Sequence, residues 1–391
     1  MKQGWEIKKL GEVCDIINGF AFKSNLFTDE GENILRISNI QNGYVDLTDI
    51  AHFNKTDYPK INFEKYAVLE DDIVVALSGA TTGKFGINKT GQKLYLNQRV
   101  AICRENTPTL NHLYLLYYLK TQAKSFLESA EGVAQPNLST EQMKQYDIPI
   151  PPREEQERIV EELDCLSGVI EKKREQLREL DALAQSIFYT MFGDPITNEK
   201  GWEVKKLGEV CEDKKKILRA SKEYAPDDVI NYIDISAVDN INNVINIPTP
   251  YIFEEAPSRA QQVVQLGDVI VSMVRPNLKN IAIVNCINDN LIASSGFCVL
   301  RVRKEMTIPF LFYIVKSDAF TMYLMDRVSG ANYPAVRESD ITDYISIVPP
   351  LALQQEFADK IEAIEKQKEL IKQSITQTET LFNARMDYYF N

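Results

Sequence analysis

Two short loops carry the side chains best suited to chemistry in this sequence. They are SGATTGK at 78–84 and RPNLKN at 275–280, and each follows an apolar, strand-sized run. Their candidate residues are Thr81, Thr82, Lys84, Arg275, Asn277 and Lys279. Arginine, lysine and asparagine side chains donate hydrogen bonds to base edges and phosphates. We expect both loops to contact DNA; the alternative is a solvated hairpin, because charged loop residues are mostly exposed.

The first loop also has some features of a nucleotide-binding P-loop. A P-loop places four residues between its glycines and a serine or threonine after its lysine. Here Gly79 and Gly83 enclose three residues, and Phe85 follows Lys84. An enzyme of nucleotide chemistry is therefore an alternative that depends on this imperfect motif alone. The sequence lacks a Rossmann-type glycine loop and an Asn-Pro-Pro-aromatic or Asp-Pro-Pro-aromatic tetrad, so we expect no methyltransferase activity within the chain and no catalytic residues.

Further polar residues could contact DNA from the N-terminal region and from two similar segments, GVAQPN and GANYPAVR. They are Lys23, Arg36, Asn39, Gln135, Asn137, Asn332, Tyr333 and Arg337. For Lys23, Arg36 and Asn39 a structural role is equally open, and the glycine and proline of the other segments are also typical of a turn. The run Lys214–Lys216 could bind phosphate, although such runs are usually solvated.

Composition excludes several other classes of function. The six cysteines show no CxxC spacing and only two histidines are present, so we predict no metal site, no cofactor and reduced, mostly buried thiols. The longest apolar runs are strand-sized, which predicts no membrane span, and without an apolar N-terminal signal we expect a cytoplasmic protein. A net charge of −12 argues against a protein that coats nucleic acid, so DNA contacts must come from local patches.

An internal repeat sets the positions of these loops. GWEIKKLGEVC at 4–14 returns as GWEVKKLGEVC at 201–211 with one change, and Asp72 later matches Asp268. The repeated Pro-Pro pairs at 151–152 and 349–350 keep a similar offset. Each copy begins with β-branched runs broken by Gly, Asn and Asp and ends with a helical stretch. We predict two α+β domains of about 150 residues, at 1–150 and 197–348.

A heptad pattern follows each Pro-Pro. Apolar residues recur at steps of three and four, which predicts long spacer helices within 151–196 and 349–391. The first helix should run from near Arg153 to near Phe192, about 60 Å at about 1.5 Å per residue. Since an amphipathic helix of this length needs a partner, we expect an antiparallel coiled coil and a pseudo-twofold dumbbell. The first helix region is acidic, with six basic and eleven acidic residues, so we expect partner subunits to cover it.

The ends of the two helices should occupy equivalent places. Met191 and Phe192 at the end of the first helix are expected to dock beside Trp202. Tyr389 and Phe390 at the end of the second helix should dock beside Trp5 in the first domain, because the offset of 198 places Phe390 where Phe192 stands.

Several motifs together resemble the specificity subunits of type I restriction-modification enzymes. They are GWEIKKLGEV, NGFAFKS, ILRISNI, YIDIS and IPIPPREEQERIVEEL. The resemblance covers essentially the whole chain, in the order target-recognition domain, helix, target-recognition domain, helix. The second helix departs from the pattern, because Lys368 and Arg385 occupy seam positions where apolar residues are expected.

The resemblance implies a non-catalytic subunit that recognises double-stranded DNA with a bipartite, asymmetric site. Each domain would read one half-site, and the helices would set the unread gap. Two methyltransferase subunits would attach to the helices, and motor-nuclease subunits would join through them. Catalysis and S-adenosylmethionine binding would belong to those partners. The alternative is a non-catalytic coiled-coil scaffold whose globular domains bind proteins.

Overall fold

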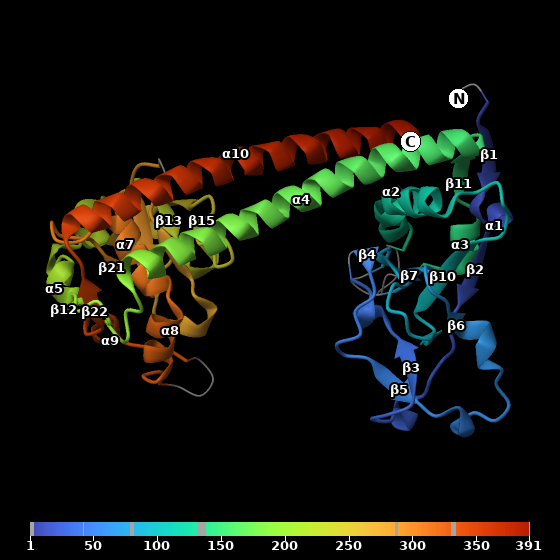
Figure 1. The fold of residues 1–391 in the computed structure, drawn as a ribbon, viewed down its shortest axis with the longest axis horizontal. Coiled ribbons are helices and arrows are strands. Elements are labelled where there is room, and N and C mark those ends of the chain that lie inside the picture. Colours follow the sequence, from blue (N-terminus) through green and yellow to red (C-terminus); the bar gives the residue numbers. More distant parts are fainter. Residues whose placement is uncertain are drawn as a thin grey trace. The chain divides into compact units, whose positions relative to one another are not determined.

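The computed structural model describes residues 4–41, 43–78, 82–130, 138–285, 288–329 and 334–390. The chain divides into two compact units. Unit 1 comprises Met1–Lys173 and Ser374–Asn391, and unit 2 comprises Arg174–Gln373. Each unit therefore contains one copy of the sequence repeat together with a segment of each long helix (Figure 1).

The repeated opening segment forms the same small sheet in both units. In unit 1, β1 (Glu6–Lys9) pairs antiparallel with β11 (Asp147–Ile150). In unit 2, β12 (Glu203–Lys206) pairs antiparallel with β22 (Ile345–Val348). Each pairing joins the first and the last strand of a globule, so the doubled sequence closes each globule in the same way.

Unit 1 contains two larger sheets. One has five strands in the order β2-β10-β7-β8-β4, and the other has four in the order β5-β3-β9-β6. The strands of the five-stranded sheet are β2 (Cys14–Asn18), β10 (Val100–Glu105), β7 (Ile73–Ala76), β8 (Phe85–Ile87) and β4 (Gly43–Tyr44). The strands of the four-stranded sheet are β5 (Ala51–Phe53), β3 (Glu32–Leu35), β9 (Leu94–Leu96) and β6 (Ala67–Val68). Strand β7 is buried along its whole length, as its continuous apolar sequence IVVA predicts.

Unit 2 repeats this design in three further sheets. Their orders are β16-β13-β20-β17, β19-β18-β21 and β14-β15. The strands are β13 (Val229–Ile233), β14 (Val238–Asp239), β15 (Val244–Ile245), β16 (Thr249–Ile252), β17 (Ala260–Val263), β18 (Val269–Ser272), β19 (Ile281–Ile283), β20 (Leu291–Ser294) and β21 (Phe297–Leu300). Strand β13 runs parallel to β20, as β3 runs parallel to β9 in unit 1. Both units are therefore mixed α+β domains, as predicted.

Short helices complete each globule. In unit 1 they are α1 (Leu10–Val13), α2 (His112–Ala130), α3 (Thr140–Lys144), η1 (Ser24–Leu26), η2 (Ile37–Asn39), η3 (Lys55–Asp57) and η4 (Phe63–Tyr66). In unit 2 they are α5 (Leu207–Val210), α6 (Ala220–Glu223), α7 (Ile308–Lys316), α8 (Asp318–Met325), α9 (Glu338–Thr342), η6 (Lys214–Lys216), η7 (Ile235–Ala237), η8 (Phe253–Glu255) and η9 (Pro276–Leu278). The late helical stretch of unit 2 is broken at Ser317, whose side chain accepts a hydrogen bond from the Phe320 amide and caps α8.

A buried aspartate–arginine pair recurs in both units. The Arg104 guanidinium donates two hydrogen bonds to Asp72, at 2.7 and 2.5 Å. The Arg301 guanidinium donates two to Asp268, at 2.8 and 2.7 Å. Both carboxylates are almost fully buried, and the bidentate pairing raises the pKa of both arginines. The pair joins the turn before the central strand to a neighbouring strand, which explains why the aspartate recurs in the repeat.

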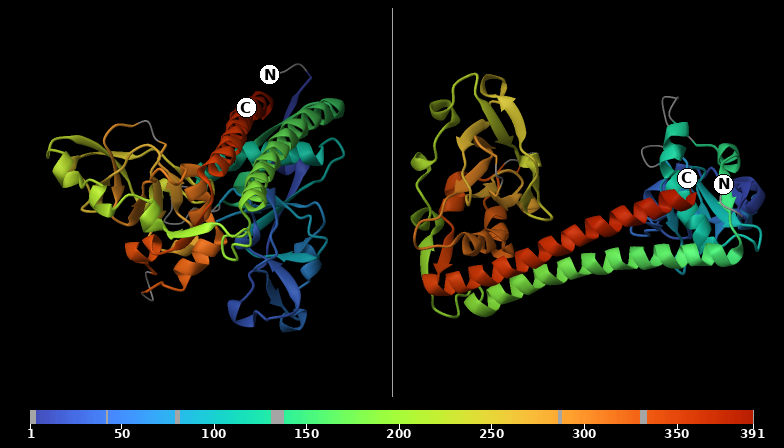
Figure 2. Two further views of the ribbon diagram at one scale, coloured as in Figure 1. Left: turned by 60° about the vertical axis from the view of Figure 1, so that its left-hand side comes forward. Right: turned by 90° about the horizontal axis from the view of Figure 1, so that it is seen from above.

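The two long helices are confirmed. Helix α4 (Arg153–Phe192) and helix α10 (Leu351–Phe390) each span 40 residues without a break (Figure 2). The first begins and ends where the heptad pattern predicts. No single helix within the described ranges is long and apolar enough to cross a membrane; the pair α7 and α8, bent by 54°, meets the criteria of length and composition only.

A buried glutamine fixes the start of α4 in unit 1. Gln156 is fully buried, and its Nε2 donates to the carbonyl oxygens of Thr109 and Pro151, both at 2.8 Å. Its Oε1 accepts a hydrogen bond from the Asn111 amide at 2.7 Å. The side chain therefore ties the first turn of α4 to the loop before α2.

Gln354 does the same for α10 in unit 2. Its Nε2 donates to the carbonyl oxygens of Glu305 and Pro349, at 3.0 and 2.8 Å, and its Oε1 accepts from the Thr307 amide at 2.9 Å. The recurrence of glutamine shortly after Pro-Pro thus has a structural cause, since each glutamine satisfies three backbone groups at a helix start.

Within each unit the segments of α4 and α10 run antiparallel. In unit 1, Glu162 pairs with Arg385 at 2.7 Å and accepts a hydrogen bond from the Tyr389 hydroxyl at 2.6 Å. Eleven residues further along α4, Lys173 donates to Ser374 Oγ at 2.6 Å. In unit 2, Lys368 pairs with Asp181 at 2.8 Å. The two basic residues at seam positions of α10 therefore face acidic residues of α4.

The predicted docking of the helix ends is confirmed in both units. In unit 2, Phe192 is fully buried and its carbonyl oxygen accepts a hydrogen bond from Trp202 Nε1 at 2.8 Å. In unit 1, Tyr389 and Phe390 are buried in the core against which Trp5 packs. The Phe390 ring lies 5.0 Å from that of Tyr114, between centroids. The last turn of α10 thus completes the core of the unit that contains the N-terminal repeat.

Candidate nucleic-acid interface

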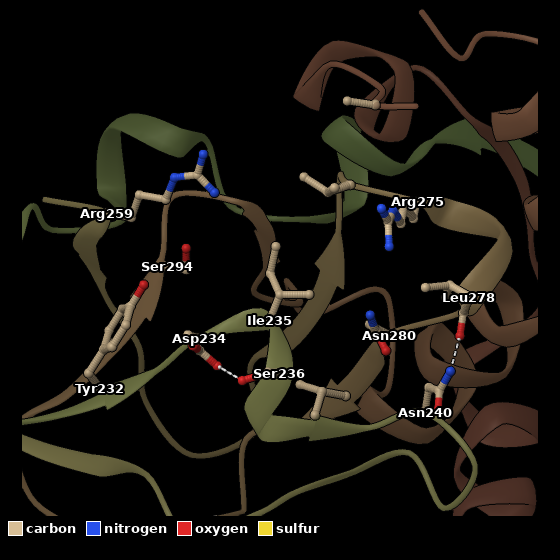
Figure 3. Close-up of a pocket in the computed structure, with 13 residues that line it drawn as sticks. Tyr232, Asp234, Ile235, Ser236, Asn240, Arg259, Arg275, Leu278, Asn280 and Ser294 are labelled. Atoms are coloured by element: carbon tan, nitrogen blue, oxygen red, sulfur yellow. Dashed lines mark hydrogen bonds between the residues drawn. The ribbon is translucent and has the colours of Figure 1, made fainter. Parts of the chain in front are cut away.

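A hollow of about 820 Å³, lined by both polar and apolar side chains, opens on the surface of unit 2 (Figure 3). We call it the polar hollow after its hydrogen-bonding side chains. It lies among the end of β13, the turn η7, the segment after β18 and the end of β20. The side chains that line it and can donate hydrogen bonds are Tyr232, Ser236, Asn240, Arg259, Arg275, Asn280 and Ser294. Donors of these types are common in contacts to phosphates and base edges.

The segment RPNLKN forms one wall of the hollow with an unusual backbone. Arg275 and Lys279 both have positive φ, 50° and 51°, in the left-handed region that non-glycine residues rarely adopt. The Arg275 amide donates to the Pro334 carbonyl oxygen at 2.8 Å, which holds this conformation. Left-handed non-glycine residues cost about 1–2 kcal/mol each and cluster at functional sites. On this turn Arg275 and Asn277 are exposed.

Lys279, a predicted DNA contact, also makes contacts within unit 2. Its Nζ pairs with Asp318 at 2.5 Å and donates to the Lys316 carbonyl oxygen at 3.3 Å. These contacts attach the turn to the end of α7 and the start of α8. Lys279 is therefore placed to position the turn that exposes Arg275.

Two arginines stand on opposite sides of the hollow. Arg259 and Arg275 flank Ile235, as Figure 3 shows. Both side chains are exposed. A guanidinium group presents a planar fork that matches guanine N7 and O6, or two phosphate oxygens.

A hairpin formed by β14 and β15 borders the hollow. Asn240 Nδ2 donates to the Leu278 carbonyl oxygen at 2.8 Å and so connects the hairpin to η9 (Figure 3). Asp239 accepts hydrogen bonds from Asn242 and from the Ile241 amide, and those from Asn242 lower the pKa of its carboxyl group. The hairpin leaves Ile241 87% exposed. An apolar side chain among polar donors suits contact with a thymine methyl group.

The corresponding loop of unit 1 is held by internal hydrogen bonds. Arg36 Nη2 donates to the carbonyl oxygen of Asp49 at 2.8 Å and pairs with its carboxylate at 3.2 Å. Asn39 is 2% exposed; its Oδ1 accepts from the Arg36 amide, and its Nδ2 donates to the carbonyl oxygens of Asp46 and Asp49. The Asn39 amide therefore stabilises the loop, in agreement with the structural interpretation.

The loop 78–84 connects β7 and β8. The Gly83 amide donates to the Ala76 carbonyl oxygen at 2.9 Å, and the Ala76 amide donates to that of Lys84 at 2.8 Å. Gly83 has a φ of 80°, and a Cβ there would lie 2.7 Å from the Ala123 carbonyl oxygen, so only glycine fits. Thr82 is 5% exposed, whereas Lys84 is exposed. Lys84 thus offers the accessible charge of this loop.

The remaining predicted residues fall into two groups. Lys23 and Arg337 are exposed at the starts of η1 and α9. Thr81, Gln135, Asn137, Asn332 and Tyr333 lie outside the described residues.

Sequence reasoning missed most residues of the hollow. Tyr232 and Ser236 are the first and last residues of the motif YIDIS, and the motif by itself does not indicate that its side chains face a hollow. Arg259 and Asn280 are brought to the hollow by the pairing of β17 and β18 with their neighbours, so their spacing in the chain carries no signal. Among the described residues, no group of three or more His, Cys, Asp or Glu side chains could hold a metal ion.

Two repeated α+β units, each closed by the same strand pairing and each containing a segment of both long helices, define a modular two-domain protein. A family model for the type I restriction modification DNA specificity domain matches residues 2–181 and 199–380. The chain belongs to this family. Specificity subunits of the family are non-catalytic and provide DNA sequence recognition.

Two relatives illustrate how the similarity is distributed. The specificity subunit of the type I restriction enzyme EcoAI from Escherichia coli is 32% identical over 203 residues, which are 48% of this chain and 33% of that protein. The putative type I restriction enzyme MjaX specificity subunit from Methanocaldococcus jannaschii is 23% identical over 402 residues, with 96% of this chain and 90% of that protein covered.

Solved structures show the same fold. A chain from a structure of complex assembly and conformational transition of the type I R-M system matches with a TM-score of 0.58 at 19% identity, covering 100% of this chain and 98% of that one. The type I restriction-modification S subunit from M. genitalium matches with a TM-score of 0.53 at 14% identity, with coverage of 100% and 98%.

Proposed function

We propose that this chain recognises a split, asymmetric double-stranded DNA site, with one half-site read by each unit. The observation that carries the proposal is a common framework with different surface loops. The aspartate–arginine pair and the glutamine at the helix start recur in both units. The loops at 78–84 and 275–280 differ in sequence. Two units with the same framework but different loops are suited to two half-sites of different base sequence.

In unit 2, Arg275, Asn277 and Arg259 are proposed to contact base edges, because they are exposed around the polar hollow. Lys279 is proposed to position the turn, since its charge is held by Asp318. Ile241 would contact a thymine methyl group. Base contacts supply specificity, and phosphate contacts supply register and most of the affinity.

In unit 1, Lys84 is the proposed direct DNA contact of the loop after β7. Lys23 and Arg36 are further proposed DNA contacts of the same unit. Asn39 and Thr82 are assigned supporting roles because both are buried. The further predicted contacts, which lie outside the described residues, stay predictions: Thr81, Gln135, Asn137, Asn332 and Tyr333. Arg337 stays a predicted contact in unit 2.

Two methyltransferase subunits are proposed to dock on α4 and α10, and motor-nuclease subunits to join through them. Exposed leucines on the helices support this proposal. Leu183 in unit 2 and Leu381 in unit 1 are each 48% exposed and occupy equivalent positions of the repeat, 198 residues apart. We propose that these equivalent helix positions belong to two equivalent docking surfaces, one for each methyltransferase.

A selection experiment tests the proposed function. The chain is assembled with its methyltransferase partner and mixed with random-sequence DNA, and the bound fraction is sequenced. We expect a motif of two unrelated half-sites separated by a gap of fixed length. A pool without any enriched motif would contradict DNA recognition and favour a protein-binding scaffold.

A further inference from the structure

A second hollow of unit 2 is lined by cationic side chains. It has a volume of about 480 Å³, and we call it the basic groove. Its charged residues are Lys214, Lys215, Arg219 and Lys222, and its other lining residues are Ile217, Leu218, Gln261, Gln262 and Ser295. No carboxylate lines the basic groove within the described part of the chain. An anionic ligand would therefore meet attraction from every charged group around it.

Local structure fixes these cations at the surface. The Lys215 amide donates to Asp213 Oδ1 at 2.8 Å, which caps the turn η6. Ile217 and Ala220 are buried and anchor the backbone on either side of Arg219. The side chains between these anchors consequently point outward, and Lys215, Arg219 and Lys222 are all exposed.

Neighbouring carboxylates neutralise only part of this charge. Lys214 pairs with Glu338, and Lys216, which is next to the groove in sequence, pairs with Glu212 at 2.6 Å. Among the described residues, Lys215, Arg219 and Lys222 form no ion pair. Three cations thus share one groove without internal compensation, in a chain whose net charge is −12.

The basic groove adjoins the polar hollow described above. Ser294 lines the hollow, and the next residue, Ser295, lines the groove. The Ser295 amide donates to the carbonyl oxygen of Arg259, which lines the hollow, at 2.8 Å. Gln262, which lines the groove, donates to the Ser294 carbonyl oxygen at 2.9 Å. One rigid, hydrogen-bonded turn therefore separates the two surfaces.

We propose that the basic groove binds the phosphodiester backbone of the DNA whose bases face the polar hollow. The inference rests on the proposed function. Lys215, Arg219 and Lys222 would each neutralise one phosphate, and these contacts would fix the register in which Arg275 meets a base pair. Phosphate contacts carry no sequence information. The groove would therefore increase the affinity for DNA and the dependence of that affinity on salt, but it would not determine any base of the recognised motif.

The test measures binding as a function of salt. The complex with methyltransferase subunits is titrated with the duplex found in the selection experiment, between about 50 and 200 mM salt, by fluorescence anisotropy. The variant is K215Q/R219Q/K222Q. The matched control is K206Q/K304Q/R327Q, which removes three exposed charges of unit 2 outside the groove and outside the long helices. Thermal melting and size-exclusion chromatography verify folding and assembly of both variants.

The groove variant should lose about 0.9 in the slope of log K against log salt for each phosphate contact, or about 2.7 for three. Near 150 mM salt its affinity should fall on the order of 100-fold, with the selected motif unchanged. The control should keep the wild-type slope. An unchanged slope in the groove variant, an equal loss in the control, or a changed motif would overturn the inference.

Failure of the proposed function has a different signature. In that case the wild-type complex itself would select no motif. A wild-type complex that selects a split motif, together with a groove variant of unchanged slope, would reject the groove alone. The single variant K215E, which changes one surface charge, provides the same slope measurement if the triple variant fails to assemble.

Discussion

Trp202 Nε1 donates a hydrogen bond to the carbonyl oxygen of Phe192 at 2.8 Å. This carbonyl group belongs to the last turn of α4, where backbone acceptors have no partner within the helix. The tryptophan of the repeated motif thus caps the helix that leads into its own globule. In unit 2 the tryptophan of the repeated motif therefore has a structural role, because its indole anchors a helix end.

The variant W202F should destabilise unit 2 by at least about 0.5–1.5 kcal/mol, because the hydrogen-bond donor is lost and the phenyl ring is smaller than the indole. The measurement is the urea midpoint of the unit 2 transition. The control V204A changes a half-exposed side chain on β12 and should stay within about 0.5 kcal/mol of wild type. Equal midpoints for W202F and wild type would contradict the capping role.

The glutamines at the helix starts should be more sensitive. Q354A leaves the Thr307 amide and two carbonyl oxygens without their partner, so we expect a loss of about 1–3 kcal/mol. Q355A alters the adjacent, exposed glutamine, which bonds only to Asp359 among the described contacts, and should have little effect. Chemical denaturation compares the two variants. A loss in Q355A as large as that in Q354A would show that helix propensity, and not the buried amide, is responsible.

Arg275 should determine one position of one half-site. R275Q is expected to lose about 1–3 kcal/mol on the selected duplex and to relax one base position. The half-site read by unit 1 should stay unchanged. K84Q provides the reciprocal variant, with its effect confined to the other half-site. Sequencing of bound DNA from random pools measures both. Simultaneous changes in both half-sites for either variant would contradict modular reading.

Cysteine reactivity should report docking of the methyltransferase. Cys165 on α4 is exposed, whereas Cys211 is buried, and burial raises the pKa of Cys211 to about 12. The thiolate is the reactive form, so Cys211 should stay protonated and unlabelled by iodoacetamide from pH 7 to about pH 9. Cys165 should be labelled in the isolated chain and protected in the complex. Mass spectrometry gives the labelled fraction; equal labelling of Cys165 with and without partner would place the docking surface elsewhere.

The long helices should set the unread gap. Four residues are inserted into α4 after Leu180 and four into α10 after Lys368, which adds about one turn, or about 6 Å, to both helices. Asp181 and Lys368 then lie on the same side of the two insertions, so their ion pair is preserved. Because a base-pair step rises about 3.4 Å, the gap should lengthen by one or two base pairs. Sequencing of methylated DNA would show the change. An unchanged gap would exclude the helices as the determinant of spacing.

The helices and the repeat were predictable because their signals are local or periodic. The heptads from Ile159 to Met191 show the limits of α4, and the offset of 198 placed Phe390 in a core that includes Tyr114. The polar seam positions were not predictable in the same way. Lys368 is compensated by Asp181, a pairing that depends on the register of two helices far apart in sequence.

The interface was predicted less completely than the fold. Asn39 and Thr82 have the residue types of DNA contacts, but burial removes them from the surface. Whether a loop side chain is buried depends on which other segments cover it, and the sequence gives no direct sign of that. Arg259 reaches the hollow through strand pairing. Residue type therefore indicates the chemistry that a side chain can offer, while its accessibility depends on the folded loops.

The place of Tyr389 and Phe390 in unit 1 has a consequence for the order of synthesis. The globule of unit 1 contains Trp5 and Tyr114 and is synthesised before that of unit 2, yet its core includes Met386, Tyr389 and Phe390. This globule stays incomplete until residues 386–390 have been synthesised. The core of unit 2 draws on residues between Ala184 and Ile364 and can close earlier. A premature stop codon shortly before Met386 would therefore damage the N-terminal globule and spare the one that lies nearer to the stop.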